Sequence, residues 1–308
     1  MLEDVPLELF AGKRFGEYIK EKEVEHKVKI MLGNVAIAPE NDDFACNVLT
    51  RKWKKNFDLV KDPDTEIVCR FSDWGIVGME GFFYPAIDTL NAQSVLQQAI
   101  RAEKDGFDAV MITCFGDPML DQIRSLVNIP VTSIGETSYH MATMMGKKFG
   151  LVTVSENNIY ESEHTIERYG FRDYCAGIMA TTEPPEEQPK ALVDAHSAIA
   201  CFQEVGRKLI AQGAEVLLPG CGLMTAALRT APGCEEEYPN GVTDVDGVPI
   251  MDVLGVTLKM TELMVQMKQS GSPWISRKGI YRLPTESAFE SGRMVLKDDR
   301  QHFWDCPV

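Results

Sequence analysis

The stretch FDAVMITCFGDPMLDQIRSLVNIPVTSIGE, residues 107–136, decides the fold class. It begins as an apolar strand that ends at Cys114, passes through a turn at 116–118 and a helix, and enters a second strand at Pro130. Open α/β sheets bind their ligands outside the carboxyl ends of the strands. Cys114 is therefore a candidate functional residue.

A second copy of this pattern lies in the other half of the chain. GAEVLLPGC (213–221) matches GFDAVMITC (106–114), and each places a cysteine eight residues after a glycine that ends a helix. After each cysteine we expect a helix and then a strand that opens with proline, at Pro130 and Pro249. The second copy is longer, and the turn-rich segment 232–244 accounts for the extra residues.

Strands and helices alternate through the rest of the chain. We predict strands at 27–33, 66–71, 149–154, 174–179 and 215–221, and helices at 44–56, 91–104, 158–169 and 191–212. Alternation of this kind implies parallel sheets. Two copies predict an α/β fold of two pseudo-symmetric Rossmann-like, flavodoxin-like domains, with an active-site cleft between the strand ends.

Composition excludes several classes of partner. The 308 residues suffice for two domains, and 44% hydrophobic with 25% charged residues are globular values. A net charge of −15 argues against binding to nucleic acid or anionic membranes. No apolar run approaches the roughly 18–20 residues of a membrane span. We expect a small-molecule substrate and a homo-oligomer.

Cysteine usage indicates reduced thiols. The eight cysteines are too sparse for a disulfide scaffold and form no C-x-x-C pair. The start MLEDVPLELF lacks the basic and apolar regions of a secretory signal, so we expect a cytoplasmic protein. Cysteines without a matched setting are interpreted as packing residues: Cys46, Cys69, Cys175, Cys201, Cys234 and Cys306.

Two matched cysteines suit proton transfer. No histidine flanks either one, which disfavours a zinc site. A Cys–His nucleophile stays open, because the base could be distant in sequence, but it leaves the duplication unexplained. A carbon acid between two thiols could lose its proton to one and regain it from the other on the opposite face. Each sulfur would lie about 3–3.5 Å from the carbon, so the sulfurs would lie roughly 7 Å apart.

The predicted helices after the cysteines suggest how the thiols are activated. A helix N-terminus lowers a thiol pKa from its ordinary value near 8.5. Backbone amides at 115–116 and 222–223 could hold a substrate oxyanion or carboxylate. GCGLMT (220–225) resembles a dinucleotide fingerprint with its last glycine replaced, a weak signal, so we expect no cofactor.

Other residues receive simpler interpretations. Asp117 is expected to cap the helix that follows it, and Arg124 to form an exposed ion pair with Asp121. The glycine- and aromatic-rich stretch 75–85 has the composition of a binding loop. His140, Trp74, Phe82, Phe83 and Tyr84 are candidates for the cleft.

At these motifs the chain resembles the hydantoin/allantoin racemases of the aspartate/glutamate racemase superfamily. Segment 114–136 is similar to the first-cysteine motif of that family, and PGCGLM (219–224) to the second. Further similar segments are MEG (79–81), KFGLVT (148–153), VPIMDVLGVTLKMTE (248–262) and SRKGIYRLP (276–284).

The resemblance implies a cofactor-free, two-base mechanism with Cys114 and Cys221 as acid and base. It implies one domain of residues 1–137 plus 253–308 and a second of 138–252. The substrate-binding residues that we expect are Asn34, Glu80, Phe115, Gly116, Thr153, Gly222 and Leu223.

Two departures from the family pattern concern the substrate. The family's Asn-Pro-Asn-rich turn is replaced by GNVAIAP (33–39), in which Asn34 retains part of the role. Leu223 stands where the second-cysteine motif usually has a small residue, and it places a larger apolar group near the second thiol. The chemistry is therefore better defined than hydantoin or allantoin as the substrate.

Three functions follow from these observations. The first is a racemase or epimerase of a small, carbonyl-activated carbon acid, hydantoin-like or derived from an amino acid. The alternative keeps the fold but is a cis–trans isomerase, decarboxylase or lyase that uses one cysteine as nucleophile or proton donor. A two-lobed binding protein without chemistry is disfavoured by the paired cysteines.

Overall fold

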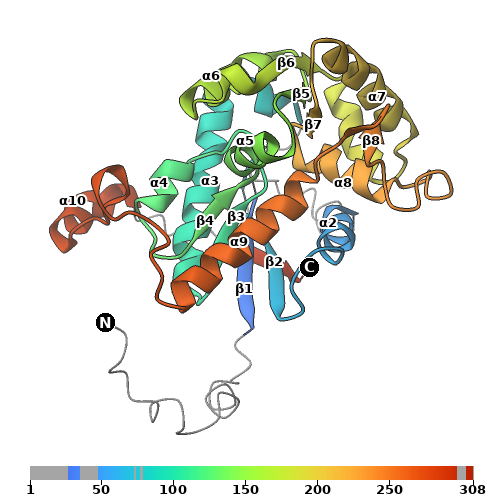
Figure 1. Ribbon diagram of the computed structural model, residues 1–308. Coiled ribbons are helices and arrows are strands. Elements are labelled where there is room, and N and C mark those ends of the chain that lie inside the picture. Colours follow the sequence, from blue (N-terminus) through green and yellow to red (C-terminus); the bar gives the residue numbers. More distant parts are fainter. Residues whose placement is uncertain (1–26, 35–47, 73, 77–78, 297–302, 308) are drawn as a thin grey trace, which may run out of the picture.

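The computed structural model describes residues 27–34, 48–72, 74–76, 79–296 and 303–307. Within these residues the chain forms two main sheets, one of five strands and one of three, with helices packed around them (Figure 1). All pairs in the smaller sheet and all but one in the larger are parallel, which confirms the predicted α/β fold class.

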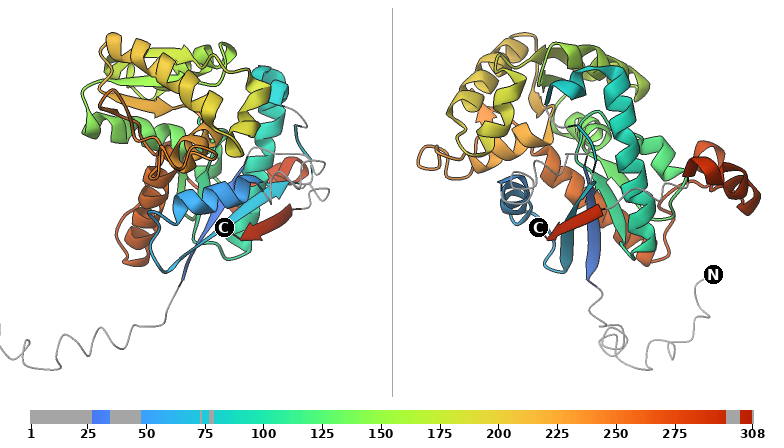
Figure 2. Two further views of the ribbon diagram at one scale, coloured as in Figure 1. Left: turned by 90° about the vertical axis from the view of Figure 1, so that its right-hand side faces the viewer. Right: turned by 180° about the vertical axis from the view of Figure 1, so that it is seen from behind.

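The larger sheet has the strand order β10-β2-β1-β3-β4. Its strands are β1 (Val28–Gly33), β2 (Thr65–Ser72), β3 (Ala109–Ile112), β4 (Val131–Ser133) and β10 (Phe303–Pro307). The edge strand β10, red in Figure 2, comes from the far end of the chain and runs antiparallel to β2. Every residue of β3 is buried, as expected of a parallel strand covered on both faces.

Helices around the larger sheet come from both ends of the chain. They are α2 (Thr50–Phe57), α3 (Pro85–Lys104), α4 (Leu120–Arg124), α5 (Ile134–Met145), α9 (Val253–Gln269) and α10 (Glu286–Leu296), with 3-10 turns η4 (Met79–Phe83) and η7 (Gly279–Tyr281). A hydrogen bond of 2.6 Å between the Thr132 and Thr261 hydroxyls joins β4 to α9. The chain thus returns to the first sheet after building the second.

The smaller sheet has the order β6-β5-β7. It is built from β5 (Phe149–Thr153), α6 (Asn157–Arg168), β6 (Cys175–Ala180), α7 (His196–Ala211), β7 (Val216–Pro219) and α8 (Gly222–Thr230), with 3-10 turns η5 (Arg172–Tyr174) and η6 (Pro185–Leu192). The predicted helix at 191–212 begins later, at His196, because the proline-rich segment before it forms η6.

The second copy of the motif departs from the first after its cysteine. Its predicted strand at Pro249 becomes β9 (Val248–Pro249), which pairs antiparallel with β8 (Asp244–Val245) in a hairpin. Asp246 and Gly247 form the turn with φ values of 50° and 83°. This hairpin diverts the chain, so only one bridge, Leu217 to Ile250, joins it in parallel to the sheet.

One apolar core spans both sheets. A single cluster of buried side chains includes Leu32 and Met111 of the larger sheet with Leu151 and Leu218 of the smaller. The predicted domain boundary at 252/253 coincides with the start of α9, whereas the one at 137/138 would fall inside α5. The division into two domains at these residues stays a prediction.

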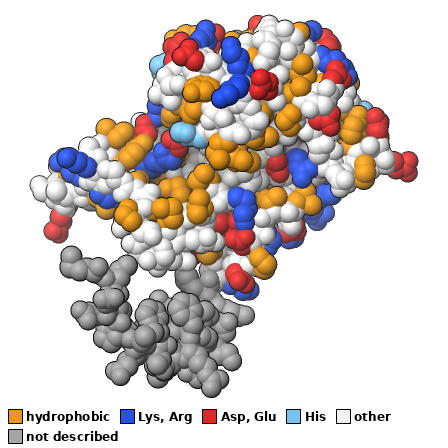
Figure 3. All heavy atoms as spheres, viewed as in Figure 1, with side chains coloured by type: hydrophobic (Ala, Val, Ile, Leu, Met, Phe, Trp, Pro, Cys, Tyr) orange, Lys and Arg blue, Asp and Glu red, His pale blue; other side chains and the backbone are white. Residues whose placement is uncertain are grey.

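The surface carries a group of exposed hydrophobic side chains. Figure 3 shows such side chains gathered across the middle of one face, over the region where α5 and α9 lie in Figure 1. In these two helices, Met144 and Met145 of α5 and Met260 and Leu263 of α9 have exposed side chains. None of the described helices has the length and apolar character to cross a membrane.

Candidate active site

The carboxyl ends of strands from both sheets meet at a cavity of about 370 Å³. Thr113 and Cys114 follow β3, Thr153 ends β5, and Cys221 follows β7, and all four line it. The two matched cysteines therefore reach one cavity from two different sheets. The apolar part of the wall comes from Leu49, Trp53, Ile76, Phe82, Phe83, Phe115 and Leu223.

Close backbone packing brings the two cysteine segments together. A Cβ atom on Gly222 would lie 2.8 Å from the carbonyl oxygen of Thr113. Only glycine therefore fits where the residue after Cys221 meets the residue before Cys114. The charge of Cys221 also contributes to raising the pKa of Cys114, so the thiols lie within electrostatic range. Their separation of roughly 7 Å stays a prediction.

The loop after Cys114 is held by Asp117. Its carboxylate accepts hydrogen bonds from the backbone N–H groups of Gly135 (2.9 Å) and Glu136 (2.7 Å) and from the Tyr169 hydroxyl (2.9 Å). Asp117 thus caps the N-terminus of α5. The expectation that it caps α4, the next helix in the sequence, is wrong. Burial raises the pKa of Asp117 to about 6 despite its hydrogen bonds.

Burial raises the pKa of both thiols. For Cys114 the next largest contribution is the negative charge of Asp88, and the Gly116 N–H only partly offsets these effects. For Cys221, which precedes α8, hydrogen bonds from the Met224 and Leu223 N–H groups lower the pKa, yet burial outweighs them. The expectation of lowered thiol pKa values is therefore wrong.

The helix expected directly after Cys114 is also displaced. α4 begins only at Leu120 and has five residues, because the chain turns through positive φ angles at Asp117 and Met119. A hydrogen bond from the amide of Gly116, a residue that we expected to bind substrate, lowers the pKa of Cys114.

Two carboxylates in the cavity wall were not singled out from the sequence. Asp88 lies in the first turn of α3, and Glu161 lies in α6. We expected α3 to begin at residue 91, which left Asp88 in a loop; Pro85, a favoured first helical residue, could have marked the true start. Nothing in the sequence around Glu161 marks it, because its position depends on how α6 packs.

Most of the predicted site residues line the cavity. Those in its wall are Asn34, Phe115, Gly116, Thr153, Gly222 and Leu223, together with both cysteines. Glu80 is exposed, lies outside the wall and accepts a hydrogen bond of 3.3 Å from the Tyr84 hydroxyl. Glu80 is thus separated from the others.

Asn34 is occupied by contacts within the protein. Its amide nitrogen donates to the Leu32 carbonyl, the Cys69 sulfur and the Arg70 carbonyl, at 3.0–3.2 Å. Its oxygen accepts a 2.7 Å hydrogen bond from the Thr113 hydroxyl. Asn34 therefore fixes the strand end beside Cys114, and only its oxygen has capacity left for a ligand.

Some of the remaining candidate residues line the cavity and others do not. Phe82 and Phe83 line the cavity, whereas Trp74 and Tyr84 do not. His140 is exposed, and its ring lies 4.9 Å from that of Phe171. Cys69 and Cys234 are buried and Cys175 and Cys201 half-buried, and all four are thiols rather than disulfides. Cys46 lies outside the described residues, and no side-chain contact is described for Cys306.

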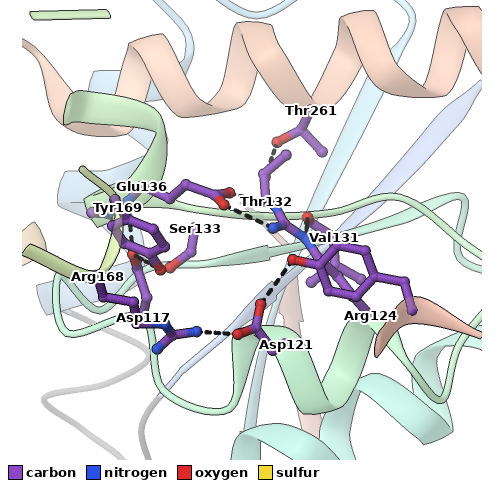
Figure 4. A network of polar contacts seen from close by, with 12 residues as sticks. Asp117, Asp121, Arg124, Val131, Thr132, Ser133, Glu136, Arg168, Tyr169 and Thr261 are labelled. Carbon is purple, nitrogen blue, oxygen red and sulfur yellow. Dashed lines mark hydrogen bonds and ion pairs between the residues drawn. The ribbon is translucent and has the colours of Figure 1, made fainter. Parts of the chain in front are cut away.

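Ion pairs surround the loop between Cys114 and α4 (Figure 4). Arg124 forms a two-pronged pair with Glu136 at 2.9 and 2.5 Å, and its Nε donates to the Val131 carbonyl. Asp121 instead pairs with Arg168 of α6. The predicted Arg124–Asp121 pair is thus wrong, because the Arg124 side chain turns inward over β4 to the start of α5.

The donor chemistry of the site is that of thiols, amides and carboxylates. Within the described part of the chain, no group of three or more His, Cys, Asp or Glu side chains could hold a metal ion. Two thiols in one cavity wall are the nucleophilic and acid–base groups that this part of the chain provides.

The fold and the site together define a class of protein. It is an α/β enzyme with two sheets, each of which places one cysteine after the end of a strand. The sequence model of the Asp/Glu/Hydantoin racemases matches residues 48–261. The chain therefore belongs to the Asp/Glu/Hydantoin racemase family, and its enzyme class is that of a racemase, an isomerase.

Individual relatives agree with this assignment. The chain is 25% identical over 210 residues to the hydantoin racemase of Pseudomonas sp. (strain NS671), covering 68% of this chain and 78% of the relative. The solved allantoin racemase from Klebsiella pneumoniae superposes with a TM-score of 0.64 at 27% identity, covering 84% and 94% of the two chains. The allantoin racemase from Pseudomonas fluorescens gives a TM-score of 0.64 at 23% identity, covering 83% of this chain and 97% of its own, and supports the fold.

Proposed function

We propose that this protein is a cofactor-independent racemase or epimerase of a small carbon acid activated by a carbonyl group, hydantoin-like or derived from an amino acid. Cys114 and Cys221 act as opposed acid and base. The observation that carries the proposal is that the two matched cysteines line one cavity from two sheets. The hydantoin and allantoin racemases among the relatives support a ring of the hydantoin type.

The surroundings of the thiols suit the transfer of a proton to and from carbon. The Gly116, Leu223 and Met224 amides donate to the sulfurs and stabilise the thiolates. The thiol pKa values are raised by burial, which brings them closer to that of a weak carbon acid and strengthens the base. The thiolate would remove the proton from one face while the opposite thiol donates one to the other.

The enclosed wall supports the same step. Phe82, Phe83 and Leu223 make much of the cavity apolar, which excludes water from the carbanion-like transition state. Asn34 would hold a substrate N–H through the free capacity of its oxygen. A cytoplasmic location and a homo-oligomer remain parts of the proposal.

The test begins with a single enantiomer of a 5-substituted hydantoin in D₂O. We expect the optical rotation to decay to zero while deuterium enters at C5, with no change in mass beyond that exchange. A panel of substituted hydantoins, allantoin and amino acids should contain at least one such substrate. If no member racemises, the proposal fails.

The same-fold alternatives give a different signature. A decarboxylase or lyase would change the carbon skeleton of its substrate, and a nucleophilic cysteine would leave a covalent adduct. Mass spectrometry of the incubated protein and products should show neither. A solute-binding protein would bind a panel member without any deuterium exchange.

A further inference from the structure

We propose that the substrate of this site carries a positively charged group, an ammonium or guanidinium, which binds between the carboxylates of Asp88 and Glu161. The inference rests on the proposed racemase function and names its substrate class. The two carboxylates line the cavity from helices of different sheets. Asp88 lies on α3 beside the larger sheet, and Glu161 lies on α6 beside the smaller one.

Both carboxylates lie near the first thiol. A Cβ on Gly116 would lie 2.8 Å from Glu161 Oε1, so this oxygen touches the backbone two residues after Cys114. The negative charge of Glu161 contributes to raising the pKa of Asp88, and both acids contribute to raising that of Cys114. The three groups therefore form one electrostatic cluster at one end of the cavity.

The described wall of the cavity supplies no cation for this cluster. Among the described residues that line the cavity there is no Lys, Arg or His.

The carboxylate oxygens are also available. Among the described residues, no donor binds the Asp88 side chain, and Glu161 receives only a weak 3.4 Å hydrogen bond from Asn158 at Oε2. Asp88 is half-buried, and a carboxylate in such a site is costly without a partner, since charged groups there are normally paired or hydrogen-bonded. A ligand cation would supply that pairing.

The same charges discriminate against anions. A free carboxylate on the substrate would face two negative groups and, among the described wall residues, no opposing basic side chain, and such like-charge contacts strongly disfavour a partner. The apolar side chains of Ile76, Phe82 and Phe83 in the same wall suit the aliphatic stem that carries an ammonium or guanidinium.

Binding of a cation would also assist the chemistry. Asp88 and Glu161 disfavour the thiolate of Cys114 through charge repulsion. A positive group placed between them would offset that repulsion and favour the thiolate only when substrate is bound. Recognition and activation would then depend on the same two carboxylates.

The test compares three hydantoins that differ only at the end of the 5-substituent: 4-aminobutyl, pentyl and 3-carboxypropyl. For the wild-type enzyme, kcat/KM for the aminobutyl compound should exceed that for the pentyl compound by about tenfold or more, with the carboxypropyl compound poorest. Asp88→Asn and Glu161→Gln should each reduce the aminobutyl-to-pentyl ratio by about tenfold. Glu163→Gln, a change on the same helix at a residue outside the cavity wall, should leave the ratio unchanged.

The outcomes separate this inference from the proposed function. If the pentyl or carboxypropyl compound is the best substrate, or if neither variant changes the ratio, the charge inference is overturned while racemase activity stands. If none of the three racemises, calorimetric binding of the same compounds decides. Preferential binding of the aminobutyl compound that is lost in Asp88→Asn supports the inference, and equal binding of all three overturns it.

Discussion

At the scale of single residues, the thiols of Cys114 and Cys221 are placed for contact with a ligand but are poorly ionised. Burial raises both pKa values, and the amide hydrogen bonds to the sulfurs recover only part of the lost acidity. Fewer enzyme molecules then carry a thiolate at neutral pH, but each thiolate is a stronger base. The balance predicts a reaction that is faster in alkaline solution.

This balance can be read from a pH–rate profile. Because burial raises the pKa of each thiol above its ordinary value, kcat/KM should rise with pH and reach no plateau below about pH 9. Initial racemisation rates measured by circular dichroism between pH 6 and 10 would show it. A plateau already reached at neutral pH would mean that the thiols are more acidic than their surroundings imply.

Asp88 should weaken the fold at neutral pH. Burial, and then the charge of Glu161, raise its pKa to about 6, against about 3.9 in an unfolded chain. Between these values the folded state binds more protons, so the free energy of unfolding falls as pH rises from 4 to 6 and stays lower above it.

Asp88→Asn should therefore be more stable than wild type by about 1–3 kcal/mol at pH 8, with the difference vanishing near pH 3.5. Urea unfolding at the two pH values measures this. A variant that is less stable than wild type at pH 8 would show that Asp88 has a stabilising partner.

At the scale of elements, the contact between the start of α8 and the end of β3 sets the distance between the cysteines. Gly222→Ala would place a Cβ 2.8 Å from the Thr113 carbonyl and push α8 away. We expect kcat/KM to fall about tenfold or more, with a loss of about 1–3 kcal/mol in stability.

Gly150→Ala is the matched control, since its Cβ would meet Leu209 Cβ at the same 2.8 Å, but on the side of β5 that packs against α7. It should lower Tm while kcat/KM of the folded enzyme stays near wild type. Equal losses of kcat/KM in both variants would mean that the α8–β3 contact has no particular role.

The two ion pairs near α4, Arg124–Glu136 and Arg168–Asp121, should differ in how much they stabilise the fold. Arg124 and Glu136 have side chains only 11% and 19% exposed, whereas Arg168 of the Asp121 pair is 42% exposed. Arg124→Met should cost about 2–4 kcal/mol of unfolding free energy, because it leaves a half-buried carboxylate unpaired. Arg168→Met should cost less than about 1 kcal/mol. Denaturant titrations of both variants compare them directly, and a reversed order would contradict this assignment.

Local patterns predicted the elements well and their partners poorly. The strands ending near Cys114 and Cys221 follow from apolar runs closed by glycine and proline, and these features are local in the sequence. The capping of α5 by Asp117 and the pairing of Arg124 with Glu136 depend on how the chain folds back. The nearer sequence neighbours that we chose for both residues were therefore wrong.

The site shows the same division. Duplication marked both cysteines, and the adjoining Phe115, Gly116, Gly222 and Leu223 followed from them into the cavity wall. Glu80 does not line the cavity, since the 3-10 turn η4 leaves its side chain exposed. Asp88 and Glu161 were missed because single acidic residues on helices carry no local signal. Only the packing of α3 and α6 brings them together.

At the scale of the whole molecule, the cavity exists only because two sheets share one core. Its walls come from segments between Asn34 and Leu223, and neither sheet alone holds both thiols. The homo-oligomer remains a prediction at this scale. Light scattering should give a multiple of the 34.4 kDa chain mass, and a mass of 34.4 kDa would contradict it.

The most direct measurement of the central claim is hydrogen exchange by single-cysteine variants. Cys114→Ser and Cys221→Ser, incubated with each enantiomer of a substrate in D₂O, should both lose racemisation by about a thousandfold or more. Each should still exchange the hydrogen of one enantiomer only, and the two variants should prefer opposite enantiomers. Racemisation at the wild-type rate in either variant, or exchange of the same enantiomer by both, would contradict a site with two opposed thiols.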